Sequence, residues 1–270
     1  MQSPGHGSPL CNGQIVICGV HQTLDMSDSH SMSSYLEWIH GNWERNSGPC
    51  ADCQIRNCDH PPYYGDGVYP ADIGLVGQAR WSTTELPADP DRTAAGPESH
   101  HERLSDRRPI DEWLVDPGDG VSRIPHLFWD DLNAGFTDDA DTTVYFTNLL
   151  KCRPVDVDWQ DDQARDLCSG YLGEELRRVD PEVVIVFGND AIDWVYEELD
   201  RENDGATNEA GRLISDEMSP YPYSVVPSVH WSYLGTMLDH IVVNSPLPLE
   251  WGDSVDAYWR RLAGVISQEL

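Results

Sequence analysis

The stretch DTTVYFTNLLKCRPVDVDWQDDQARDLCSGYLGEELRRVDPEVVIVF, residues 141–187, decides the fold of this chain. Residues 144–147 are β-branched or aromatic and lead to Asn148, and a second short apolar run spans residues 183–187. Between the two runs, apolar residues recur at helical spacing from Asp161 onward, so one face of a helix can cover a sheet. Two short apolar strands joined by a helix predict a buried parallel βαβ unit.

Polar residues follow directly where the first of these strands ends. They are Asn148, Lys151, Cys152 and Arg153. Ligands of α/β proteins bind at the carboxyl ends of parallel strands. We therefore expect the functional site at this end of the predicted sheet.

Length and composition favour one domain. With 270 residues and 39% apolar content, the chain can bury a core. We expect residues 1–30 to form a flexible extension and residues 31–270 to form a single domain. Residues 82–120, which are dominated by Asp, Pro, Gly, Arg and His, are expected to be a long insertion with little regular structure.

The remaining elements are predicted from apolar periodicity and turn residues. The pattern predicts helices at residues 31–43, 125–132, 189–199 and 253–268, and strands at residues 73–77 and 223–229. The second of these strands leads to His230. Residues 14–20 are either a strand or a loosely packed extension, and Gly77 is expected to turn the chain after its strand.

Acidic residues dominate the charge. The chain has 47 Asp and Glu against 17 Lys and Arg, a net charge of -30, and a single lysine, Lys151. Because the acidic residues occur in nearly every segment, they indicate an acidic surface typical of proteins from salt-loving organisms such as haloarchaea. The alternative is an acidic mesophilic protein. Neither excludes nucleic acid as a partner, because counterion release contributes little to binding at molar salt.

The sequence shows neither a long apolar segment nor a secretory signal, so a cytoplasmic protein without a membrane association is expected. Seven cysteines are an odd number. In a reducing compartment they are metal ligands or free thiols more often than disulfides.

Two segments supply the candidate metal ligands. CADCQIRNC contains Cys50, Cys53 and Cys58, while Cys152 and Cys168 lie sixteen residues apart. Four thiolates from two separated segments suit either a [4Fe-4S] cluster or a structural zinc ion, and spacing does not separate the two. Cys58 competes with Cys53 as a ligand on spacing.

Four motifs in order resemble the uracil-DNA glycosylase superfamily. They are YFTNLLKCRP, the sixteen-residue step between the two later cysteines, PEVVIVFGNDA and VVPSVHWSYL. The iron-sulfur-containing family 4 branch is the most similar, and the resemblance covers residues 35–238 apart from the insertion.

The resemblance implies an α/β fold, a three-layer αβα sandwich with a central, mostly parallel four-stranded sheet. Members flip a damaged or modified base such as uracil out of DNA and hydrolyse its N-glycosidic bond, since the bond is unreachable inside the base stack. A monomer that acts on single- or double-stranded DNA in base excision repair is expected.

The resemblance also implies residue roles. The amide of Asn148 would pair with the edge of the flipped base, since it offers a donor and an acceptor side by side. His230 would stabilise the negative charge that develops on the base. Independently of the resemblance, a backbone that turns at Gly77 can aim its amides at a ligand, although a lone glycine after a strand is more often only a turn. The cluster ligands would be Cys50, Cys53, Cys152 and Cys168, with structural zinc as the alternative to [4Fe-4S].

The first catalytic motif departs from the family. Gln78 stands where this branch carries Glu, and Ala79 stands where a sister family carries Asp. A neutral Gln can orient a water molecule but cannot take its proton. Asp130 and Asp131 are candidates for the missing acid.

Further candidates concern contact with the base and the DNA. Trp81 and Phe128 are candidates to stack on the base, and Lys151, Arg153 and Ser232 are candidates to contact the DNA. The second motif carries His230-Trp231-Ser232 where the family has His-Pro-Ser.

Three hypotheses remain. The first is a DNA glycosylase, and the second is a catalytically impaired protein with the same fold that binds nucleic acid or regulates another protein. The third is a zinc-stabilised α/β protein whose binding site lies at Asn148.

Overall fold

The computed structural model describes residues 32–51, 53, 65–79, 114, 124–152, 162–198, 202, 205, 210–214, 223–231 and 254–270. The expected N-terminal extension, the strand considered at residues 14–20 and almost all of the expected insertion lie outside these residues. In the described part, no helix is both long enough and apolar enough to cross a membrane.

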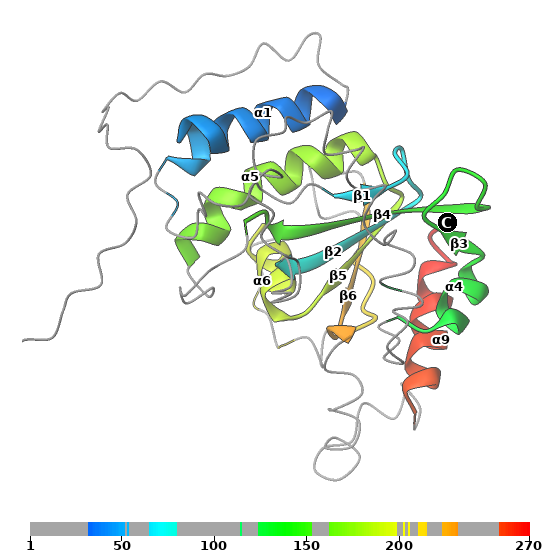
Figure 1. Cartoon of the computed structure of the whole chain (residues 1–270). Helices are drawn as coiled ribbons and strands as arrows, with labels where there is room; N and C mark the ends of the chain where they lie inside the picture. The colour runs from blue at the N-terminus through cyan, green and yellow to red at the C-terminus, as the bar shows by residue number, and fades with distance from the viewer. Residues whose placement is uncertain are drawn as a thin grey trace, which may run out of the picture.

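A mostly parallel sheet forms the centre of the molecule (Figure 1). Its order is β1-β4-β2-β5-β6, and β3 also pairs with β4. The strands are β1 (Asp66–Gly67), β2 (Ile73–Ala79), β3 (Ala134–Gly135), β4 (Thr142–Leu150), β5 (Val183–Phe187) and β6 (Ser224–Ser228). The four longer strands are parallel, as expected, while β1 is antiparallel to β4. The two-residue strands β1 and β3 extend the predicted four-stranded sheet to six strands.

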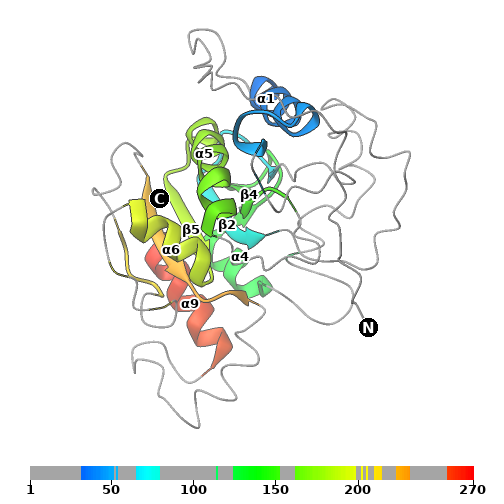
Figure 2. The same cartoon turned by 90° about the vertical axis from the view of Figure 1, so that its left-hand side faces the viewer.

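The predicted helices are confirmed with small shifts at their ends. They are α1 (Met32–Arg45), α4 (His126–Leu132), α5 (Asp162–Val179), α6 (Asn189–Glu198) and α9 (Val255–Ile266). A short 3₁₀ helix, η1 (Gly48–Cys50), follows α1. Helices α4 and α9 cover one face of the sheet and α5 and α6 cover the other, with α1 outermost over α5 (Figures 1 and 2). The αβα arrangement is therefore as expected.

The helix α5 joins two parallel strands, as the βαβ prediction requires, but these strands are not neighbours. Strand β2 lies between β4 and β5 and pairs with both of them in parallel. The pairs β2–β4 and β2–β5 therefore join strands that are not consecutive in the chain, and β2 occupies the middle of the sheet.

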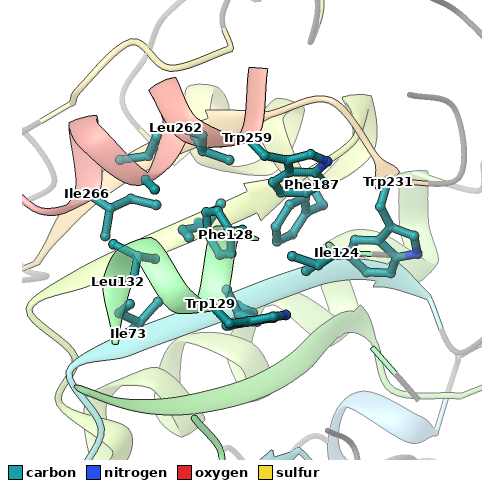
Figure 3. Packing of buried hydrophobic residues seen from close by; sticks show 14 of the residues in the cluster. Ile73, Ile124, Phe128, Trp129, Leu132, Phe187, Trp231, Trp259, Leu262 and Ile266 are labelled. Carbon is teal, nitrogen blue, oxygen red and sulfur yellow. The ribbon is translucent and has the colours of Figure 1, made fainter. Parts of the chain in front are cut away.

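Alternating residues of the central strands fill two different cores. Ile73 and Leu75 of β2 face α4 and α9, whereas Val76 packs with the apolar side of α6. Figure 3 shows the first core, in which Phe128 of α4 and Trp259 of α9 meet over the sheet. Because both faces are covered, the strands are apolar throughout, which explains the continuous apolar runs in the sequence.

Candidate active site

The carboxyl ends of β2 and β4 bring two predicted site residues together. Gly77 and Asn148 are direct partners in the parallel register. Asn148 is 4% exposed, and the preceding residue on the same face of β4 is Phe146, which belongs to the core. The Asn148 amide therefore lies at the edge of an apolar surface, where a planar ligand could use its donor and acceptor.

The missing side chain of Gly77 makes room for this amide. A Cβ atom at Gly77 would lie 2.6 Å from Oδ1 of Asn148 and 3.5 Å from the Phe146 ring. The prediction that Gly77 turns the chain is wrong, because β2 continues through Ala79 and pairs with β4 to its end. The glycine is needed here for close approach rather than for a turn.

Gln78 and His230 approach each other across Gly188, which directly follows β5. A Cβ atom at Gly188 would lie 3.4 Å from Cβ of His230 and 3.9 Å from Oε1 of Gln78. Gly188 itself has φ +86°, which glycine adopts without strain. The Nε2 atom of Gln78 is buried and has no hydrogen-bond partner among the residues that the structure describes. Its amide is therefore a donor available to a ligand.

The structure places the candidate replacement acids at the wrong end of the sheet. Asp130 and Asp131 lie in the last turn of α4, and the next residue but one, Asn133, accepts a hydrogen bond from the backbone of Thr142 at the amino end of β4. Asp131 also pairs with Arg260 of α9 at 3.3 Å. The length of β4 separates these carboxylates from Asn148, so they cannot supply the charge that the first motif lacks.

Lys151, a predicted DNA contact, lies inside the fold. Its side chain is 1% exposed, and Nζ donates to Oγ1 of Thr147 at 2.7 Å and to the carboxylate of Glu175. The amine points into the face of the sheet that α5 covers. Burial and the ion pair together remove it from the reach of a phosphate group.

Glu175 of α5 is the centre of a buried polar network that the sequence reasoning missed. Besides Lys151, its carboxylate accepts hydrogen bonds from Tyr145 Oη at 2.7 Å, Gly65 N at 2.9 Å, Thr147 Oγ1 at 2.9 Å and Tyr35 Oη at 3.3 Å. Burial and the neighbouring carboxylate raise the pKa of Tyr35 well above its usual value. The only signal in the sequence is that Glu175 follows Cys168 by two helical turns, on the same face of α5.

Phe128 is a core residue rather than a stacking platform for a base. It is 0% exposed, and its ring contacts Trp129 and Trp259 at centroid distances of 5.1 Å (Figure 3). Stacking on a base would require α4 to leave α9. The other aromatic candidate, Trp81, and the predicted DNA contacts Arg153 and Ser232 lie outside the described residues.

The four predicted metal ligands meet in one part of the fold. Cys50, Cys152 and Cys168 are buried in the same apolar cluster between α1, α5 and β4, and Cys53 packs against it. None of the four forms a disulfide. Cys58 lies outside the described residues.

The surroundings of these thiols are apolar and aromatic. Burial, together with the nearby thiols of Cys53 and Cys50, raises the pKa of Cys168 to about 12. Sγ of Cys50 lies 3.4 Å from the Tyr171 hydroxyl. Within the described ranges, no three His, Cys, Asp or Glu side chains are arranged to hold a metal ion. The donor set nevertheless fits a thiolate-bound group, since a cation would offset the cost of ionising three buried thiols and the partly buried Cys53.

Comparisons with known proteins match part of the chain. A family model for the uracil DNA glycosylase superfamily matches residues 107–250, just over half of the chain. A type-4 uracil-DNA glycosylase from Saccharolobus solfataricus is 23% identical over 87 residues, which cover 32% of this chain and 40% of that relative. The family match includes Asn148 and His230 but begins after β2, the strand that carries the divergent first motif.

Proposed function

The chain belongs to the uracil-DNA glycosylase superfamily, and on that premise we propose that it binds DNA and hydrolyses the N-glycosidic bond of uracil or another damaged base. The observation that carries the proposal is the close approach of Asn148 to Gly77 at the carboxyl ends of β2 and β4; Gln78 and His230 both lie near Gly188, directly after the neighbouring strand β5. These side chains come from three strand ends. Their amide and imidazole groups can form hydrogen bonds, which recognition of a flipped base requires.

Each residue has a distinct role in the proposed reaction. The Asn148 amide pairs with the edge of the base and selects it. His230 donates a hydrogen bond to the base oxygen on which negative charge develops as the bond breaks. The Gln78 amide orients the attacking water molecule, which must lose its proton to solvent or to the departing base because Gln78 is neutral.

The cysteine cluster has a structural part in this proposal. Cys50, Cys53, Cys152 and Cys168 would hold a [4Fe-4S] cluster, which would cross-link α1, the end of β4 and α5; structural zinc is the alternative. Visible absorbance and metal analysis of the purified protein separate the two, because the iron-sulfur protein is brown and the zinc protein is colourless.

A second candidate function is DNA binding without cleavage. The specific observation in its favour is that neither Gln78 nor Ala79 provides an acid at the end of β2, while the other candidate acids lie at the opposite end of the sheet. A site of this kind would still bind a flipped base through Asn148. Without an acid, the oxocarbenium-like transition state would be poorly stabilised.

A base-release assay distinguishes these functions. Oligonucleotides that carry uracil, hypoxanthine, xanthine or alkylated bases are incubated with the protein at molar KCl, and alkali reveals abasic sites. Release that is abolished by Asn148→Ala and His230→Ala supports the glycosylase. Release that both variants leave unchanged contradicts the site, and tight DNA binding without any release favours the second candidate.

Gln78→Glu is the complementary variant. It places an acid where the family 4 branch has one, next to His230 across Gly188. If the missing acid limits catalysis, base release rises, whereas Gln78→Ala lowers it. A Gln78→Glu protein that is folded, binds DNA and releases base no faster than the parent contradicts this account of the first motif.

A further inference from the structure

The last helix of the chain reaches the strand end that carries His230. Tyr258 of α9 is 0% exposed, and its hydroxyl lies 2.8 Å from Oγ of Ser228. The same hydroxyl accepts a hydrogen bond from the backbone N–H of Val229 at 3.0 Å. Val229 is the residue between the end of β6 and His230.

The contact between Tyr258 and Val229 lies directly after the last residue of β6 that pairs with β5. In the described sheet, β6 is the edge strand, and its register with β5 ends at Ser228. The N–H group of Val229 therefore bonds to a side chain from α9 instead of to a strand. Because backbone donors beyond a strand end otherwise bond to water and fray, the Tyr258 hydroxyl restricts the position of the residue before His230.

A second contact holds the chain on the other side of His230. Trp231 is 6% exposed and packs among the rings of the α4 and α9 core, with ring centroids 4.9 Å from Phe187 and 6.1 Å from Phe146 (Figure 3). The His230 ring lies 4.2 Å from the Trp231 ring. The indole thus anchors the backbone directly after His230, in the position where the resembling family has proline.

We propose that Tyr258 and Trp231 are positioning residues that hold His230 over Gly188 from both sides. The role of His230 in this inference rests on the proposed function. Helix α9 lies beyond residues 107–250, the segment that the superfamily match covers, so the Tyr258 contact is not part of that match. The hydroxyl acts through the Val229 backbone and not on the substrate.

Tyr258→Phe tests the proposal because it removes one oxygen atom and leaves the ring in the core. Ser254→Ala is the matched control: Ser254 caps α9 by accepting a hydrogen bond from Ala257 N at 3.2 Å, so its loss weakens the helix without touching β6. Hydrogen exchange of residues 223–231 and steady-state base release are measured for both variants and the parent.

We expect Tyr258→Phe to speed exchange at Val229 and to lower kcat about 10- to 100-fold, with KM changed much less, because misplacement of a catalytic group acts on the transition state. Ser254→Ala is expected to lower the melting temperature while kcat stays near that of the parent. A Tyr258→Phe variant with unchanged kcat, or a Ser254→Ala variant with an equal loss of kcat, overturns the proposal.

The exchange measurement separates failure of this proposal from failure of the proposed function. If the parent protein releases no base, the proposed function fails, and exchange alone tests the contact. Faster exchange at Val229 in Tyr258→Phe, but not in Ser254→Ala, then supports the positioning role, and equal exchange overturns it. Trp231→Leu provides a second variant, expected to speed exchange on the carboxyl side of His230.

Discussion

Gly77 contributes to the proposed site because it has no side chain and so leaves room for the Asn148 amide. The Asn148 amide occupies the volume that a Cβ atom at Gly77 would need, and the two residues are fixed opposite each other by the register of β2 and β4. An added methyl group at Gly77 would therefore displace the amide that we propose to pair with the base. Neither the backbone conformation nor a turn at Gly77 explains the glycine.

We predict that Gly77→Ala lowers base release by about 100-fold, because a displacement of about 1 Å in a positioned group has an effect of that size. The control is Gly264→Ala in α9, where an added Cβ meets nothing within 4 Å. The control is expected to stabilise the protein by about 0.5–1 kcal/mol, since alanine restricts the unfolded chain and favours a helix. Base release at the parental rate in Gly77→Ala would contradict the proposed place of Asn148.

At the scale of elements, the ion pair of Lys151 and Glu175 connects β4 with α5. Lys151 lies between Asn148 and Cys152 in sequence, directly after the strand that carries the amide. Its partner Glu175 lies on α5, the helix that carries Cys168. Buried ion pairs contribute little net stability against apolar substitutes, but removal of one partner leaves an uncompensated charge. The pair thus makes the relative placement of β4 and α5 specific.

We predict that Lys151→Met lowers the free energy of unfolding by about 3–5 kcal/mol, because the buried Glu175 side chain is left without its ion-pair partner. The double variant Lys151→Met/Glu175→Gln is expected to recover a large part of this loss. Urea unfolding followed by circular dichroism measures both. Equal stability of the single variant and the parent would show that Lys151 is not buried against Glu175.

The contact between α9 and β6 also predicts a pH dependence. Burial raises the pKa of Tyr258 from 10.0 to about 12. Because the folded pKa is above the unfolded one, the folded protein holds this proton more tightly, and the stabilisation is complete below pH 10 and is lost as the pH rises toward 12. The parent should lose about 2–3 kcal/mol more stability than Tyr258→Phe across this range. Parallel pH profiles of the two proteins would contradict the prediction.

At the scale of the whole molecule, the net charge of -30 sets the conditions in which the fold is stable. Ion pairs such as Arg165 with Glu197, 2.9 Å apart, leave an excess of 30 carboxylates, because 47 Asp and Glu are matched by only 17 Lys and Arg. Repulsion among carboxylates therefore remains and depends on screening by salt. A salt-loving source stays a prediction from composition.

We predict that the melting temperature rises by roughly 4–8 °C when KCl increases from about 0.1 M to about 2 M, which corresponds to a gain of about 2 kcal/mol from the shorter screening length. Differential scanning calorimetry at several salt concentrations measures the change. Sucrose at matched osmolality is the control and should give a smaller rise. A melting temperature that is independent of KCl would contradict the interpretation of the charge.

The sequence alone determined the four longer strands, the helices and the order of the motifs, but not the two-residue strands β1 and β3. Buried parallel strands are apolar on both faces, so runs such as residues 183–187 are recognisable without a structure. Helical spacing identified α1, α5, α6 and α9, since each buries one face. The cysteines were recognisable because each of their two segments carries its spacing locally, and the polar residues after β4 follow directly from one strand.

Only the tertiary structure decided which of these residues meet and which are buried. Strand β2 lies between β4 and β5, which brings Gly77 against Asn148, and the chain's only lysine turns inward to Glu175 instead of outward to DNA. Tyr258 reaches Val229 from a helix that is 29 residues away along the chain. Local periodicity reports whether a segment has a buried face, but partners distant in sequence are set by packing across the whole core, which no single segment encodes.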